Sequence, residues 1–128
     1  MKYLLISLLF LSAACPADSA DRCFDETLCS VSIIHLVSDP ELYDKKEVIV
    51  RGYFLYEEKQ SYLYLDSEKA EYGLSEYSLS LTFDGVEAED IQEHSGSYAL
   101  IQGVFDQSNR GIGIFTIGSV KVTRLRLP

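Results

Sequence analysis

Hydrophobic and polar positions alternate over several short stretches in the second half of the chain. Alternation with a period of two, rich in β-branched and aromatic residues, is typical of β-strands that bury one face. The clearest case has Leu79, Leu81 and Phe83 on one side and serine or threonine between them. The chain is therefore expected to be mainly β, with strands over residues 47–56, 61–66, 76–83, 98–106, 112–117 and 120–127.

Two stretches break this alternation. Residues 84–95 gain acidic side chains and predict a short helix or loop between the third and fourth strands. Upstream, residues 38–41 read Ser-Asp-Pro-Glu, and a capping side chain followed by proline and an acid is typical of a helix start. We expect a short helix there, before the first long strand, whereas residues 30–37 are apolar without a clear period.

A six-residue pattern occurs twice, at residues 49–54 and 100–105: aliphatic, aliphatic, polar, glycine, any residue, phenylalanine. Glycine inside a strand weakens a flat sheet, and its usual reason is a bend or bulge where the sheet coils into a barrel. Gly52 and Gly103 therefore predict two strands that bend across a barrel.

The order strand-strand-strand-helix-strand-strand resembles the OB-fold, a five-stranded Greek-key barrel. The resemblance covers about residues 39–127, with a break or bulge at Gly118-Ser119 near the end. It implies one OB-like domain over residues 30–128, with a short helix before the first long strand and another between strands 3 and 4. A meander sandwich or another small barrel is the alternative.

The beginning of the chain has the features of an export signal. Lys2 is followed by an apolar run over residues 3–11, about half the ~20 residues that a membrane-spanning helix needs. Residues 11–15, Leu-Ser-Ala-Ala-Cys, resemble the lipobox of bacterial lipoproteins, although Ser12 stands where leucine is usual. The resemblance implies a lipoprotein signal peptide over residues 1–14 and an acylated Cys15. Ordinary cleavage after Ala17 or Ala20, or an uncleaved anchor, are the alternatives.

Two further cysteines, Cys23 and Cys29, form an even pair once Cys15 is set aside. In an exported protein such a pair predicts a disulfide. The spacing is not Cys-x-x-Cys, and two cysteines without partners cannot complete a tetrahedral metal site. We expect residues 15–29 to form a short tether and a disulfide loop.

The segment SDPELYDKKEVIVRGYF resembles the opening of small bacterial envelope lipoproteins with OB-like barrels, in which the run P-E-x-Y-x-G-K-x-V-x-V-x-G is common. Lys45 stands where that run has glycine. The resemblance implies a place in the cell envelope and carries no activity that can be transferred. Cys15 is not followed by the aspartate that favours inner-membrane retention in enterobacterial lipoproteins, so the outer membrane is preferred over the inner. A periplasmic or secreted protein is the alternative location.

Composition limits the function. The chain of 128 residues suits one domain, and its formal net charge of −9 argues against nucleic acid as a partner. His35 is expected at the packed edge of the domain and His94 on an exposed connector, with no nucleophile motif near either. Acidic residues between the third and fourth strands lack the spacing of a calcium loop, so a solvated helix face is favoured for Asp84, Glu87, Glu89, Asp90 and Glu93. No cofactor, no metal and no enzymatic activity are expected.

The nine tyrosines are the most distinctive feature of the composition. By strand alternation Tyr62 and Tyr64 share one face of the first hairpin, and Tyr53 lies on the preceding strand. Aromatic residues on this face of an OB-fold commonly stack on ligands, although tyrosine is also a good strand former with a polar tip. The hypothesis is a lipid-anchored binding module for an envelope protein, peptide or glycan. The alternatives are an assembly accessory of a larger envelope complex and a soluble periplasmic ligand-binding protein.

Overall fold

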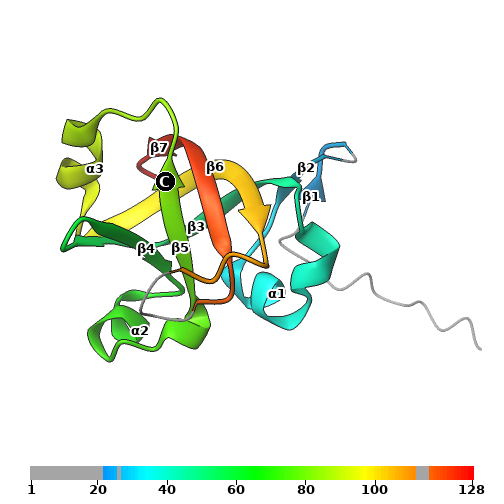
Figure 1. The fold of residues 1–128 in the computed structure, drawn as a ribbon, viewed down its shortest axis with the longest axis horizontal. Helices are drawn as coiled ribbons and strands as arrows, with labels where there is room; N and C mark the ends of the chain where they lie inside the picture. Colours follow the sequence, from blue (N-terminus) through cyan, green and yellow to red (C-terminus); the bar gives the residue numbers. More distant parts are fainter. Residues whose placement is uncertain (1–21, 26, 112–115) are drawn as a thin grey trace, which may run out of the picture.

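A closed barrel forms the centre of the computed structural model, which describes residues 22–25, 27–111 and 116–128 (Figure 1). Its strands follow the order β3-β4-β5-β7-β6, and β6 pairs back onto β3 to close the ring. β5 and β7 run parallel, whereas the other neighbours in the barrel are antiparallel. The expected mainly β, five-stranded OB-like barrel is confirmed, with strands β3 (Glu47–Glu57), β4 (Gln60–Tyr64), β5 (Ser78–Phe83), β6 (Ser97–Asp106) and β7 (Ser119–Arg126).

Two short strands lie outside the barrel. β2 (Leu28–Ser30) pairs in parallel with the start of β3, and β1 (Arg22–Cys23) pairs antiparallel with β2. Cys23 lies opposite Cys29 in this pairing, and the expected disulfide between them is present. In Figure 1 this hairpin extends from the side of the barrel opposite α3. The sheet thus includes the disulfide loop.

Short helices connect the strands. α1 (Ile33–Ser38) begins where the Ser32 side chain accepts a hydrogen bond from the backbone N–H of His35, and the 3-10 helix η1 (Pro40–Tyr43) follows, with proline in its first turn. The expected helix start is therefore η1, with α1 before it. α3 (Ala88–His94) lies between the third and fourth barrel strands, as expected. Two more helices had no counterpart in the prediction, namely α2 (Ser67–Glu71) and the 3-10 helix η2 (Ser75–Tyr77).

The ends of the five barrel strands differ from the prediction by one or two residues, and one further predicted strand is not found in the described part of the chain. β5 begins at Ser78 because residues 75–77 form η2. Of the expected strand over residues 112–117, residues 112–115 lie outside the described part, and Thr116 and Ile117 are not in a strand. The Thr116 hydroxyl donates to the Gly118 carbonyl, and its backbone N–H donates to the Arg110 carbonyl. The bonds of Thr116 are therefore local, whereas the Ile117 backbone N–H donates across to the Ser78 carbonyl at 3.1 Å, beside the β5–β7 pairing.

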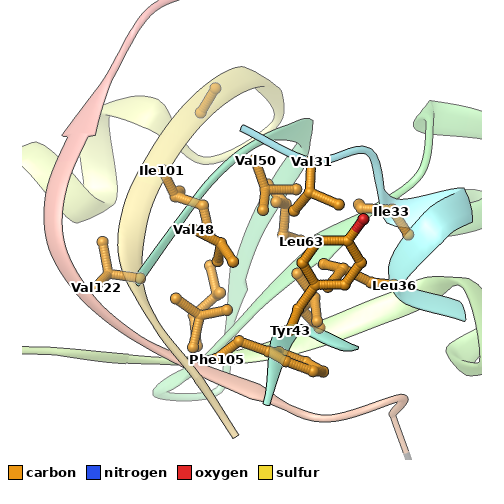
Figure 2. Packing of buried hydrophobic residues seen from close by; sticks show 14 of the residues in the cluster. Val31, Ile33, Leu36, Tyr43, Val48, Val50, Leu63, Ile101, Phe105 and Val122 are labelled. Atoms are coloured by element: carbon orange, nitrogen blue, oxygen red, sulfur yellow. The ribbon is translucent and has the colours of Figure 1, made fainter. Parts of the chain in front are cut away.

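The core fills the barrel interior. Phe54, Leu63, Leu79, Ile101 and Phe105 are fully buried there and come from four different strands. Figure 2 shows the helical residues Ile33, Leu36 and Tyr43 next to this cluster. These short helices bury their apolar side chains on the barrel and cover part of its interior.

Both glycines of the repeated pattern lie where another backbone approaches closely. A Cβ on Gly52 would stand 2.5 Å from the Tyr64 carbonyl oxygen. A Cβ on Gly103 would overlap the Lys121 carbonyl oxygen, and a register shift between Gln102 and Gly103 marks a bulge in the pairing with β7. The expected bulge is therefore found at Gly103, whereas at Gly52 the structure shows a close backbone approach without a register shift.

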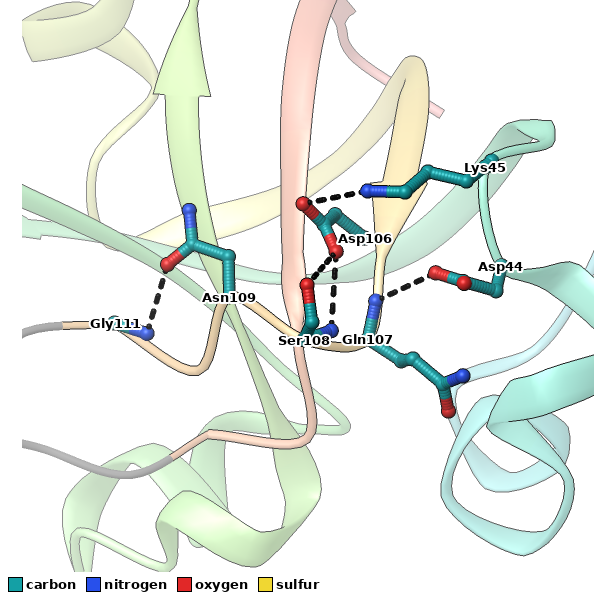
Figure 3. Close-up of polar contacts among 7 residues, drawn as sticks. All are labelled: Asp44, Lys45, Asp106, Gln107, Ser108, Asn109 and Gly111. Atoms are coloured by element: carbon teal, nitrogen blue, oxygen red, sulfur yellow. Dashed lines mark hydrogen bonds and ion pairs between the residues drawn. The ribbon is translucent and has the colours of Figure 1, made fainter.

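A polar cluster ties the turn before β3 to the end of β6 (Figure 3). Lys45 Nζ lies 2.9 Å from Asp106 Oδ2, and Asp44 accepts a hydrogen bond of 3.0 Å from the Gln107 backbone N–H. The backbone of Lys45 has a φ of +63°, in the left-handed region that glycine adopts most easily. Lys45 therefore adopts a backbone conformation that glycine favours, although it carries a lysine side chain.

Candidate functional site

Tyrosine side chains form a row across the outer face of the barrel. Tyr53 of β3 lies between Tyr98 of β6 and Tyr64 of β4 in the strand register. The rings of Tyr53 and Tyr98 meet edge to face, with their centroids 5.4 Å apart. Two of the three tyrosines predicted from the sequence are therefore neighbours, and Tyr98 joins them from a strand 45 positions away from Tyr53.

Tyr62 lies in the next row of the same face. It pairs with Leu55 across the strands, and its ring centroid lies 6.2 Å from that of Tyr64. Its hydroxyl donates a hydrogen bond to the side-chain oxygen of Gln60, and the side chain is almost completely buried. Tyr62 thus supports Tyr64 from one side.

A groove of about 680 Å³ opens over this face. Its floor belongs to β3 and β4, and α2 forms a wall. α2 is placed by two backbone N–H groups: that of Lys69 donates to Asp66 Oδ1 at 2.8 Å, and that of Ser67 donates to the Tyr98 hydroxyl at 3.2 Å. The groove is lined by Tyr53, Leu55, Glu57, Tyr64, Ser67, Glu68, Ala70, Glu71 and Gly73.

The charges at the groove all have one sign. Glu57, Glu68 and Glu71 line it, and no lysine or arginine does. None of the three carboxylates forms an ion pair within the described residues. Lys69 is on the same helix, but its ammonium lies 3.9 Å from Asp66 Oδ2 and 5.6 Å from the centroid of the Tyr77 ring. The groove therefore has a negative potential that the described residues leave unbalanced.

Tyr64 is the most enclosed of the lining residues, with 4% of its surface exposed. Its hydroxyl forms no hydrogen bond with any part of the chain that the structure describes. Burial raises the pKa of this phenol, and the neighbouring Tyr62 and the charge of Glu57 add to the shift. Tyr64 consequently stays protonated at neutral pH and presents a hydroxyl at the groove.

The other candidates from the sequence lie elsewhere. Cys15 is outside the described residues. The acidic residues of 84–93 lie on and before α3, where Asp84 pairs with Lys121 at 3.7 Å and the other four are exposed. His35 is half-buried, and so is His94, which bonds the Asp90 carbonyl oxygen and is less exposed than expected. Within the described ranges, no group of three or more acidic, histidine or cysteine side chains is arranged to hold a metal ion.

Two parts of the groove were missed by sequence reasoning. α2 had a local signal, because Asp66 is a good N-cap and Ser67 to Glu71 contains good helix formers. Tyr98 had none, because only the pairing of β3 with β6 brings it next to Tyr53. In the part of the chain that is described, no helix is long and apolar enough to cross a membrane.

Comparisons with known proteins show no family for this chain. No protein-family model matches the sequence, and no curated protein matches it significantly. A solved structure from Leishmania major Friedlin, provisionally assigned as an aspartyl-tRNA synthetase, is similar at a TM-score of 0.47 and 15% sequence identity. The similarity covers 82% of this chain and 21% of that one, so this chain spans about a fifth of its length. No conclusion about fold or function follows from a similarity of this extent, and the β-barrel is established by the strand pairing of this chain itself.

Proposed function

We propose that this protein is a non-enzymatic, lipid-anchored protein of the cell envelope that binds a ligand in the groove between its tyrosine row and α2. The observation that carries the binding function is the groove itself. It has aromatic rings from β3 and β4, an apolar floor, and a Tyr64 hydroxyl without a partner in the described chain. Ligand sites typically combine such a surface with a few polar groups.

The proposed location has separate support. Residues 1–15 resemble a lipoprotein export signal that ends at Cys15, and the Cys23–Cys29 disulfide suits an oxidising compartment outside the cytoplasm. The outer membrane is the preferred site of the anchor. A tether of a few residues would hold the barrel close to the membrane surface.

The test uses the full-length protein, extracted in detergent and immobilised. Arrays of glycans and of short peptides, and an extract of envelope proteins, are passed over it, and whatever is retained is measured again with Tyr53→Ala and Tyr64→Phe. Tyr64→Phe removes only the unpartnered hydroxyl and keeps the buried ring. Thr82→Ala, an exposed position on β5 outside the groove, is the matched control.

A retained compound whose affinity falls in both tyrosine variants, and not in Thr82→Ala, supports the proposal. Retention that is the same in all variants contradicts the groove as the binding site. If one envelope protein is recovered in stoichiometric amount, equally with wild type and with both tyrosine variants, the protein is an assembly accessory instead. Chemical conversion of a retained compound would overturn the non-enzymatic assignment.

A further inference from the structure

We propose that the groove takes a cationic group on an aliphatic stem, the chemistry of a lysine or arginine side chain, from a basic peptide segment of a partner. This inference rests on the proposed function of the same groove and specifies its ligand. Three features carry it: the carboxylates at the wall and floor, the aromatic and aliphatic surface between them, and the unpartnered Tyr64 hydroxyl.

The carboxylates set the sign of the ligand. Glu57 comes from β3, and Glu68 and Glu71 come from α2, so they approach the groove from two elements. Lys69 of α2 is directed to Asp66 and to the Tyr77 ring. Neither Lys69 nor Arg51 of β3 lines the groove. An anionic ligand such as a phosphate would meet three like charges here, whereas an ammonium or guanidinium group would balance them.

The surface between the carboxylates suits the rest of such a side chain. Tyr53 presents an aromatic ring, and a cation within about 6 Å of a ring face is attracted to it. Leu55 and Ala70 supply apolar contact for a methylene stem. An uncharged sugar would use the rings but would leave the three carboxylates without a role.

The hydroxyl of Tyr64 supplies the second, independent indication of a ligand. The residue is 4% exposed and lines the groove, yet its oxygen has no hydrogen-bond partner in the described chain. The oxygen is therefore accessible from the groove and can bind a donor group of a ligand directly. A bound ammonium or guanidinium can donate to this oxygen, since both carry only donors.

The experiment measures binding of four probes to the full-length protein in detergent by calorimetry: tetralysine, its fully acetylated form, tetraglutamate and spermidine. We expect tetralysine to bind and to weaken with added salt, and the acetylated and acidic peptides to bind at least about tenfold more weakly. Spermidine distinguishes a free polyamine from a basic peptide as the source of the cation. If it binds as tightly as tetralysine, the natural ligand is a free polyamine and the peptide assignment falls.

Charge-matched variants locate the site. Glu57→Gln/Glu68→Gln/Glu71→Gln should weaken tetralysine binding about tenfold or more. Glu87→Gln/Glu89→Gln/Glu93→Gln removes the same charge at α3 and should leave binding within about twofold. Tetralysine binding that falls equally in both triple variants would show attraction to the acidic molecule as a whole and would overturn the inference.

The two proposals fail in different ways. The protein could fail to bind tetralysine but retain a neutral glycan or peptide in a way that depends on Tyr53 and Tyr64. This result would refute the cationic ligand and still support the groove as a binding site. Loss of tetralysine binding in the groove triple variant and in Tyr64→Phe supports both. Tyr64→Phe keeps the buried ring, so its thermal unfolding checks that the fold is unchanged.

Discussion

At the scale of single residues, Gly103 shows how one missing side chain lets the barrel close. The Lys121 carbonyl oxygen of β7 occupies the place of a Cβ, next to the bulge that follows Gln102. Gly103→Ala should therefore lower the free energy of unfolding by about 3 kcal/mol, as for severe overpacking. Denaturation by urea measures this. Val104→Ala, at the exposed neighbouring position, should cost about 1 kcal/mol or less, and an equal loss in both variants would contradict the steric argument.

The turn between β3 and β4 carries backbone strain at two residues. Glu58 and Lys59 form a two-residue loop, and their φ angles are +51° and +65°. Such hairpin loops favour Asn-Gly because ordinary residues avoid positive φ. We expect Lys59→Gly to raise the free energy of unfolding by about 0.5 to 1 kcal/mol, after the greater flexibility of unfolded glycine is counted. Lys121→Gly, at a residue in extended backbone, should lower the free energy of unfolding. A lower free energy of unfolding in both variants would contradict the proposed backbone strain at Lys59.

Asp106 makes stability depend on acid pH. Hydrogen bonds from the Ser108 hydroxyl and from Lys45 lower its pKa from 3.8 to about 2. Because the folded pKa is below the unfolded one, the stabilisation is fully present above about pH 4 and is lost as the pH falls through about 2. Thermal unfolding of Asp106→Asn should therefore begin at a lower temperature than wild type at pH 7, with a difference that disappears near pH 2. A difference that is constant with pH would exclude this role for the carboxylate.

At the scale of elements, the β1–β2 hairpin lies outside the closed ring and its disulfide spans a short loop. In the chain-entropy model a loop of this size contributes only about 2 kcal/mol. Cys23→Ser/Cys29→Ser should lose about that amount of unfolding free energy and keep the circular dichroism spectrum of a β-barrel. An unfolded double variant would show instead that the hairpin is needed to form the barrel.

The elements also show how far sequence reasoning extends. The barrel strands were found because alternation is a local signal, and Gly52 and Gly103 indicated closure before any contact was known. α2 has five residues, too few for a helical period, and β1 and β2 have two and three. The groove needs α2 as its wall and Tyr98 as the support of that wall. The Asp66 N-cap is a local signal for α2, but no local pattern encodes its contact with Tyr98.

At the scale of the whole molecule, net charge and the proposed anchor act together. A chain with a formal net charge of −9 is repelled by anionic lipid headgroups. An acylated terminus would therefore hold the domain near the membrane, while the surface of the domain would not bind the headgroups. The groove would then remain open to a partner. Under the proposed function, the location of the whole protein would therefore depend on Cys15.

Removal of the Cys15 thiol tests this directly. In wild type, mass spectrometry of the membrane fraction should find a mature terminus at Cys15 that carries acyl chains. Cys15→Ser should abolish acylation, and any chain of this variant that is still cleaved should leave the membrane fraction, because it lacks an acyl anchor. Cys23→Ser leaves the lipidation signal intact and should stay in the membrane fraction, which separates the loss of a lipid from the loss of a disulfide. A wild-type terminus after Ala17 or Ala20, without lipid, would make the protein a secreted or periplasmic one.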